Sequence, residues 1–245
     1  MAKNWLERTE LLIGENKVEA LSKSNVLIVG LGGVGGFAAE FLCRAGIGSF
    51  TLVDGDVYDL TNKNRQIMAT AETIGLSKAE VTAKRLQSIN PNVKLQVLQL
   101  FVKPENIAAL LSEPYDFVLD CIDSITPKIA LIEEAKKRNF AVISSMGAGG
   151  RLNPNLVEVA DLRKTRACKL AKTIRKRLQK DILKMGVPVV YSSELVIESS
   201  LQLTDGSNFK KSFYGTISYM PAIFGLYMAW YVLDMLTKHE KTNNI

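Results

Sequence analysis

The chain has 245 residues, 47% of them hydrophobic and 23% charged, which predicts one soluble globular domain spanning residues 1–245. Its net charge of +6 is uneven: residues 163–184 contain ten basic residues and one acidic residue, a net +9, so the remainder sums to −3 and one basic element is expected to attract polyanions. The three cysteines form no CxxC pair and His239 is the only histidine, which argues against disulfides, bound zinc and histidine-based acid–base catalysis, and fits a reducing cytoplasm.

Short apolar runs alternate with helical patterns over residues 1–150. The N-terminal stretch is charged throughout and does not resemble a signal peptide, so none is expected. Buried strands are expected at 24–30, 49–54, 93–98, 117–121 and 141–145. Helices are expected at 33–45, 77–89, 105–111 and 128–138. This alternation predicts an α/β fold with a doubly wound, Rossmann-like, mostly parallel sheet and helices on both faces.

The pattern changes in residues 151–245, which we interpret as an extension of the core. Strands are expected at 157–161 and 187–192, with a basic helix between them and a mobile loop at 201–213. The segment 217–236 is strongly apolar, but Pro221, Gly225 and Asp234 interrupt it, and a membrane span needs about 20 apolar residues. A buried or dimer-interface helix is therefore favoured, and membrane association through this helix is not.

A glycine motif, Gly30-x-Gly32-x-x-Gly35, lies at the junction of the first strand and the first helix of the core. Glycines here allow a tight turn and let a phosphate approach the amides at the helix N-terminus. Asp54 ends the second strand, where a carboxylate can bind ribose hydroxyls. This motif fits NAD as readily as ATP, and glycines required only for close packing are the alternative.

Three charged residues at strand ends favour a nucleoside triphosphate over NAD. Arg65 and Lys78 can neutralise the charge that develops on a leaving pyrophosphate. Asp123 follows a buried strand at the carboxyl end of the sheet, where it can hold magnesium. Read singly, each could be an ordinary surface charge.

The runs VLIVGLGGVGGFAAEFLCRAGIGSFTLVDGDVYDLTNKNRQ, GLSKAEVTAKRLQSINPNV and DFVLDCIDS resemble the adenylation domain of ubiquitin-activating-type enzymes and their bacterial ThiF and MoeB relatives. The resemblance implies an ATP site made of Gly30, Gly32, Gly33, Gly35, Asp54, Asp56, Asn62, Arg65, Gln66, Lys78 and Asp123. It assigns the ribose to Asp54, the phosphates to Asn62, Arg65 and Lys78, and magnesium to Asp123. It also implies a homodimer in which an N-terminal arginine, here Arg8, reaches the partner's active site; an exposed helix residue is the alternative for Arg8.

Further segments resemble the tRNA threonylcarbamoyladenosine dehydratase branch of that superfamily. They are RTELLIGENKVEAL, SSMGAGGRLNP, VADLRKTRACKLAKTIRKRL, PVVYSSE and GTISYMPAIFG, so the resemblance extends over nearly the whole chain. It implies that ATP adenylates the threonine carboxylate of the modified nucleoside next to the anticodon, and that the ring then closes with loss of water. It makes residues 151–245 the tRNA-binding and dimerisation part, and it leaves open a bound sodium or potassium ion and a sulfur-transfer or cysteine desulfurase-type partner.

The cysteines separate this branch from relatives that activate sulfur-carrier proteins, which usually have paired CxxC motifs and a catalytic cysteine. Some dehydratases have a cysteine in the loop before the final helix, but residues 209–215 contain none. A covalent thioester is therefore not expected, unless Cys168 forms it.

The basic helix has an apolar stripe, in which Leu170, Ile174, Leu178 and Ile182 recur every four residues. Such a stripe can pack down while the cations face outward. We interpret the cations as binding tRNA and not DNA, with a solvated face or a phospholipid surface as alternatives. The expected tRNA-binding residues are Lys164, Arg166, Lys169, Lys172, Arg175, Lys176, Arg177 and Lys180.

Two other functions remain open at this stage. One is adenylation of the C-terminal glycine of a ubiquitin-like or sulfur-carrier protein. The other is an NAD-dependent oxidoreductase or a nucleotide-sensing module, although the sequence has no Tyr-x-x-x-Lys pair after a strand to assist hydride transfer.

Overall fold

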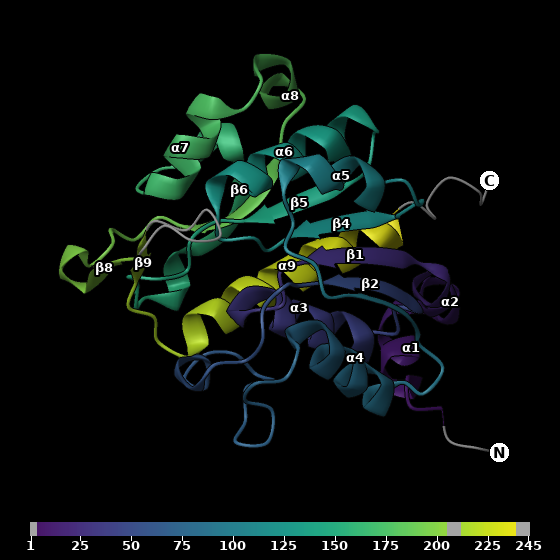
Figure 1. Ribbon diagram of the computed structural model, residues 1–245. Coiled ribbons are helices and arrows are strands. Elements are labelled where there is room, and N and C mark those ends of the chain that lie inside the picture. The colour runs from purple at the N-terminus through teal and green to yellow at the C-terminus, as the bar shows by residue number, and fades with distance from the viewer. Residues whose placement is uncertain (1–3, 205–211, 239–245) are drawn as a thin grey trace.

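A seven-stranded sheet forms the centre of the computed structural model, which describes residues 4–204 and 212–238 (Figure 1). Its strand order is β3-β2-β1-β4-β5-β7-β6. The strands are β1 (Asn25–Val29), β2 (Ser49–Val53), β3 (Lys94–Leu98), β4 (Phe117–Asp120), β5 (Val142–Ser145), β6 (Val157–Asp161) and β7 (Pro188–Ser192). Only β6 pairs antiparallel, so the predicted doubly wound, mostly parallel sheet is confirmed.

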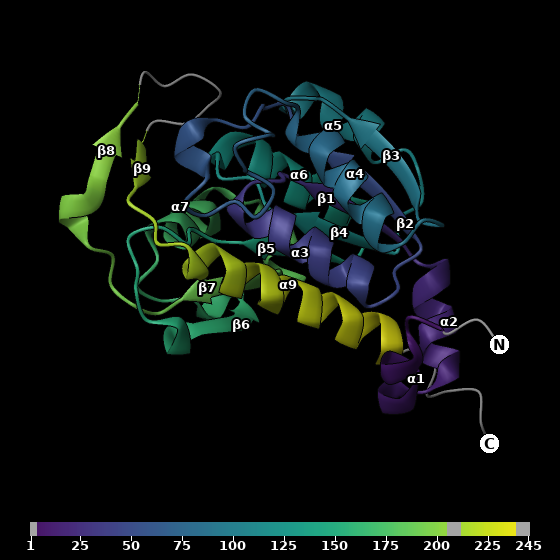
Figure 2. The same ribbon diagram turned by 90° about the horizontal axis from the view of Figure 1, so that it is seen from below.

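Helices cover both faces of the sheet. They are α1 (Glu7–Ile13), α2 (Glu15–Lys23), α3 (Gly33–Arg44), α4 (Lys78–Ile89), α5 (Pro104–Leu110), α6 (Ile125–Lys137), α7 (Lys169–Arg177), α8 (Lys180–Lys184) and α9 (Tyr219–Lys238). Figures 1 and 2 show α3, α4 and α9 on one face and α5, α6, α7 and α8 on the other. In β1, Val26 and Ile28 pack into the core beneath α3 and α9, whereas Leu27 and Val29 pack into the core beneath α5 and α6. Burial on both faces explains why this strand is a continuous apolar run.

Helix α9 crosses one face of the sheet and packs closely against α3 (Figure 2). A Cβ added at Gly225 would lie 2.7 Å from the carbonyl oxygen of Val34, so only glycine permits this approach. Within the described residues, α9 is the one helix long and apolar enough to cross a bilayer. Met220, Phe224 and Met228 are fully buried, as predicted for a core helix, whereas Trp230 on another side is 52% exposed.

The basic segment differs from the single helix that was predicted. It forms two helices, α7 and α8, because the backbone is extended at Leu178 and Gln179. The Gln179 amide N–H and side chain both donate to the carboxylate of Glu133 on α6, at 2.8 and 2.9 Å, which holds the break in place. The apolar stripe nevertheless packs down, with Ile174, Leu178 and Ile182 buried.

Two further segments were not predicted as regular structure. Helices α1 and α2 precede the first strand and lie beyond its amino end (Figure 1). The segment expected to be a mobile loop instead has a strand at each side, β8 (Leu201–Leu203) and β9 (Ser212–Tyr214), which pair antiparallel. Residues 205–211 of that segment and His239 lie outside the described residues.

Candidate active site

The sheet reverses its winding between β1 and β4, and loops from the carboxyl ends of neighbouring strands meet there. Gly30 follows β1 directly and has a φ of +91°, and a Cβ at this residue would lie 2.8 Å from the Cys121 carbonyl oxygen beyond β4. A Cβ at Gly35 would lie 1.8 Å from the Gly30 carbonyl oxygen. These two glycines are therefore required for the turn and for helix α3 to start directly above it.

Gly32, the remaining glycine of the motif, and its neighbour Gly33 have different surroundings. A Cβ at Gly33 would lie 2.8 Å from the Cβ of Pro221, so Gly33 lets α9 pack against the start of α3. A Cβ at Gly32 would meet only the side-chain amide of Gln66, at 3.5 Å. Gly32 thus leaves backbone amides approachable at the N-terminus of α3, where a phosphate is favoured. Close packing therefore explains Gly30, Gly33 and Gly35, whereas ligand access explains Gly32.

Asp54 is hydrogen-bonded to the glycine loop, the turn after β1 that contains Gly30 and Gly32. Its Oδ2 accepts a hydrogen bond from the Leu31 amide at 2.7 Å, and its Oδ1 accepts one from the Asp56 amide at 2.8 Å. Burial raises the pKa of Asp54, and the nearby positive charge of Lys78 opposes that rise. The carboxylate therefore sits at the junction of the loop and β2, where sequence reasoning placed the ribose contact.

Lys78 is the first residue of α4 and is only 6% exposed. Its amide N–H donates to the Asp56 carbonyl oxygen at 3.0 Å, and its Nζ forms an ion pair with Asp56 Oδ2 at 3.1 Å. The long side chain is thus held at both ends beside Asp54. The structure brings Asp54, Asp56 and Lys78 together.

The segment between β2 and α4 presents the remaining predicted residues. Asn62 is buried and ends a short 3₁₀ helix, Leu60–Asn62, where its Oδ1 accepts from the Asp59 amide at 3.2 Å. The Arg65 guanidinium donates to the Thr61 carbonyl oxygen at 2.9 Å. Burial lowers the pKa of Arg65, whereas the charge of Asp123 raises it, so Arg65 and Asp123 interact electrostatically.

Gln66 supplies an unusual polar atom next to Gly32. Its side chain is buried, and its Oε1 has no hydrogen-bond partner among the described residues. Buried acceptors in folded proteins normally have a partner. A ligand that presents an N–H or O–H group beside Gly32 would satisfy this oxygen.

A buried ion pair at the carboxyl end of β4 was missed by the sequence reasoning. Asp120 Oδ2 and Lys128 Nζ lie 2.6 Å apart, and both side chains are fully buried. Lys128 also donates to Ser144 Oγ at 3.1 Å and to the Ser145 carbonyl oxygen at 2.9 Å. The carboxylate of Asp120 accepts from the Ile122 amide at 3.1 Å, which fixes the turn that leads to Asp123. A charged residue inside the apolar run FVLDC was the signal that could have found it.

Arg8 does not join this site within one chain. It is exposed on α1, which precedes β1 and lies at the amino ends of the strands (Figure 1). The glycine loop lies at the opposite ends of the same strands. Only a second chain could bring an Arg8 side chain to the glycine loop.

The acidic residues fit a magnesium ion that arrives with phosphates. Within residues 4–204 and 212–238, no three His, Cys, Asp or Glu side chains gather as a metal centre. Magnesium bound with a nucleotide needs only one or two carboxylates, since phosphates and water supply its other ligands. Asp123 at the carboxyl end of β4 is suited to that role.

The predicted RNA-binding cations lie on and before α7 and α8, and most face solvent. Apart from Lys169, six of them are exposed on the surface: Lys164, Arg166, Lys172, Lys176, Arg177 and Lys180. Lys169 is also exposed but pairs with Glu198 at 2.6 Å. Arg175 points inward and donates to the Leu162 and Thr165 carbonyl oxygens at 3.1 and 3.0 Å. The exposed six form the basic surface of the molecule.

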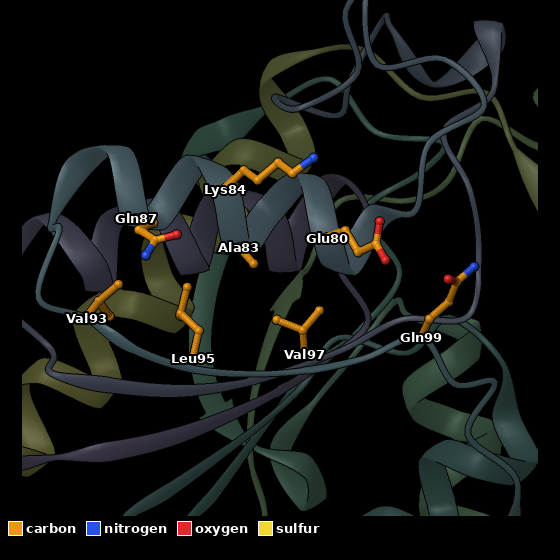
Figure 3. A pocket seen from close by; sticks show the side chains of 8 residues that line it. All are labelled: Glu80, Ala83, Lys84, Gln87, Val93, Leu95, Val97 and Gln99. Carbon is orange, nitrogen blue, oxygen red and sulfur yellow. The ribbon is translucent and has the colours of Figure 1, made fainter.

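A groove of about 640 Å³ lies elsewhere, between α4 and the edge strand β3 (Figure 3). It is lined by Glu80, Ala83, Lys84, Gln87, Val93, Leu95, Val97 and Gln99. None of the predicted ATP-site residues is among them, so the groove is separate from the candidate active site.

Comparison with known proteins identifies the family of the chain. The profile of the ThiF family matches residues 6–245. The tRNA threonylcarbamoyladenosine dehydratase of Escherichia coli is 40% identical over 203 residues, which cover 79% of this chain and 76% of the relative. The enzyme of the same name from Bacillus subtilis is 37% identical over 238 residues, which cover 94% of both chains.

The solved structure of the E. coli dehydratase TcdA in complex with ATP has the same fold, with a TM-score of 0.87 and 35% identity. The match covers 98% of this chain and 96% of that structure. The chain therefore belongs to the ThiF family, in which it is similar to tRNA threonylcarbamoyladenosine dehydratases over most of its length.

Proposed function

We propose that the chain is an ATP-dependent tRNA threonylcarbamoyladenosine dehydratase. The observation that carries the proposal is the similarity along 94% of both chains to a dehydratase, since the nucleotide motifs alone are shared by the whole superfamily. The substrate is threonylcarbamoyladenosine next to the anticodon of a tRNA, in the cytoplasm. Its product is the cyclic nucleoside, formed with net loss of one water.

ATP binds where the glycine loop meets α3. Its phosphates approach the amides around Gly32, and Asp54 accepts hydrogen bonds from the ribose hydroxyls. Lys78, held by Asp56 at 3.1 Å, is directed at the phosphates together with Arg65. Asn62 keeps the segment that carries Arg65 and Gln66 in place through its cap on Asp59.

The first step is adenylation. A carboxylate oxygen of the threonine moiety attacks the α-phosphorus of ATP, the bond to the bridging oxygen of pyrophosphate breaks, and pyrophosphate leaves with that electron pair. Lys78 and Arg65 stabilise the negative charge that grows on the leaving group. Asp123 would hold a magnesium ion here, which would supply further charge neutralisation when bound.

The second step is ring closure within the substrate. The carbamoyl group bonds to the activated carbonyl carbon and loses a proton, and AMP leaves. A tethered nucleophile has a high effective concentration, so no protein nucleophile is needed. The cysteines agree with this, because Cys43 and Cys168 are buried. Burial raises the pKa of Cys43 to about 11 and raises the pKa of Cys121 by a larger amount, which disfavours reactive thiolates.

The decisive experiment compares pyrophosphate release from ATP with tRNA that carries threonylcarbamoyladenosine and with unmodified tRNA. We expect release only with the modified tRNA and only with magnesium, with a mass loss of one water in the nucleoside. Release triggered by a small carrier protein and not by tRNA would instead establish the alternative adenylation activity.

The basic surface would hold the tRNA backbone, which positions the anticodon loop without reading its sequence. Replacing Lys172, Lys176 and Arg177 together by glutamine is expected to weaken tRNA binding at all tRNA sequences. The slope of log K against log salt should become shallower by about 2 to 3, since each lost phosphate contact contributes roughly 0.7–0.9. Titration at several salt concentrations measures this.

The matched control replaces three exposed lysines outside α7 and α8, Lys84, Lys94 and Lys103, and so removes the same charge. It should leave the salt slope almost unchanged. Equal slopes for the two triple variants would refute a specific RNA role for α7.

We also propose a homodimer in which Arg8 completes the partner's active site. The support is the exposure of Arg8 far from its own glycine loop, together with Leu11 and Leu12 on the same helix, which are 82% and 83% exposed. Arg8→Ala and Lys78→Ala proteins should each be inactive alone. Mixed and allowed to exchange chains, they should regain about a quarter of wild-type activity, because half of the dimers are mixed and each contains one intact site. No recovery after demonstrated chain exchange would contradict action across the dimer.

A further inference from the structure

Arg151 is a buried cation with an unusual set of partners. Its residue is only 3% exposed. The guanidinium donates to the main-chain carbonyl oxygens of Gly147 and, at 3.3 Å, of Glu194. It makes longer contacts, both at 3.5 Å, with the carbonyl oxygens of Gly149 and Ala167. No carboxylate among the described residues forms an ion pair with it. The hydrogen-bond partners of this guanidinium are therefore main-chain carbonyl groups.

These carbonyls belong to three loops that connect different helices and strands. Gly147 and Gly149 lie in the loop after β5, at the carboxyl edge of the sheet that carries the candidate active site. Ala167 has a φ of +54° and immediately precedes Cys168, the N-cap of α7. Glu194 follows β7, and its own carboxylate accepts from the Leu152 and Asn153 amides at 3.0 and 2.9 Å.

Other contacts show that the same loops pack as one unit. The Gly150 amide donates to the Gly215 carbonyl oxygen at 2.8 Å, and a Cβ at Gly150 would lie 3.1 Å from the Tyr214 ring. The Tyr214 hydroxyl lies 3.4 Å from Lys169 Nζ on the first turn of α7. The β8–β9 hairpin therefore contacts both the loop after β5, which carries Arg151, and the start of α7.

Without a cation, four carbonyl oxygens would converge on one point with like partial charges. Their mutual repulsion would separate the loops, and the strained backbone at Ala167 would lose part of what holds it. Arg is suited to this position because its planar group directs five N–H donors outward in fixed directions.

We infer that Arg151 is a positioning residue that fixes the basic surface of α7 relative to the active-site edge of the sheet. This inference rests on the proposed function. A tRNA bound on α7 must present the threonine carboxylate of its modified nucleoside to the α-phosphorus of ATP. Arg151 keeps α7 and the active-site edge at the separation that this step requires. A misplacement of about 1 Å is sufficient to cost about 10²-fold in rate.

The test replaces Arg151 by methionine, which keeps the apolar stem and removes the charge, and by lysine, which keeps the charge. For Arg151→Met we expect kcat for pyrophosphate release with modified tRNA to fall about 10²-fold, with the Kd for ATP within about twofold of wild type. Arg151→Lys should retain an intermediate rate. Millimolar guanidinium chloride, added to an Arg151→Ala protein, should restore part of kcat by occupying the same carbonyls.

Arg138→Met is the matched control. Arg138 also donates to a main-chain carbonyl, that of Leu111, at 2.8 Å, but it follows α6 away from the glycine loop. It should keep wild-type kcat and should not respond to guanidinium. Wild-type kcat in Arg151→Met would overturn the positioning role. So would a lower kcat in Arg151→Ala that guanidinium does not restore, if Arg151→Lys is equally slow. Failure of the wild-type protein itself to release pyrophosphate with modified tRNA would instead refute the proposed function.

Discussion

Replacing Lys78 by alanine is expected to lower kcat for pyrophosphate release by about 10²–10³-fold while leaving the fold intact. This is the usual cost of removing one fixed group that stabilises charge in a transition state. Lys78 is preorganised for that role because Asp56 holds its ammonium group at 3.1 Å and the start of α4 fixes its backbone. Single-turnover assays with modified tRNA would separate this loss from slower ATP binding.

Lys84 offers a control on the same helix. It is exposed at the edge of the groove in Figure 3, so Lys84→Ala should keep wild-type kcat. A circular dichroism spectrum equal to that of wild type would show that Lys78→Ala folds. Full activity in a folded Lys78→Ala protein would exclude the proposed ATP site.

Replacing Lys128 by methionine is expected to lower the free energy of unfolding by about 3–5 kcal/mol, because it leaves the fully buried carboxylate of Asp120 without its partner. For a chain of this size, such a loss lowers Tm by about 10 °C. Urea unfolding followed by circular dichroism measures the free energy directly.

The double variant Asp120→Asn, Lys128→Met tests the cause. It removes both charges while the asparagine oxygen can still accept from the Ile122 amide, so it should be more stable than Lys128→Met alone. If the loss of unfolding free energy in the double variant equals the sum of the losses in Asp120→Asn alone and Lys128→Met alone, the two side chains are not coupled. Lys137→Met, an exposed lysine at the end of the same helix, should change stability by less than about 0.5 kcal/mol.

The sheet could be predicted because each core strand is a short apolar run that is buried on both faces. The runs ending at Gly30, Asp54 and Cys121 are separated by segments with helical spacing, and the parallel topology follows from that alternation. The break between α7 and α8 could not be predicted, because it depends on Glu133, which lies 46 residues earlier in the chain. Tertiary contacts of this kind leave no local pattern.

The residues of the candidate site could likewise be predicted only in part. Asp54 and Lys78 could be placed from their positions at the end of a strand and the start of a helix. The roles of Arg175 and Arg151 could not, because both are basic residues that donate to main-chain carbonyl oxygens outside regular structure, a contact that leaves no pattern in the sequence. Sequence alone does not distinguish an arginine that faces solvent from one that binds the backbone of its own chain.

The contact between Gly33 and Pro221 has a consequence for synthesis of the protein. The glycine loop leaves the ribosome early, but the helix that packs against the start of α3 is made nearly two hundred residues later. Until α9 docks, the apolar side of α3 and the neighbouring strands have no cover, and a nascent chain in that state is prone to aggregate. The loop reaches its final packing only when α9 has been translated, so a stalled or truncated chain would contain the whole nucleotide motif without its finished shape.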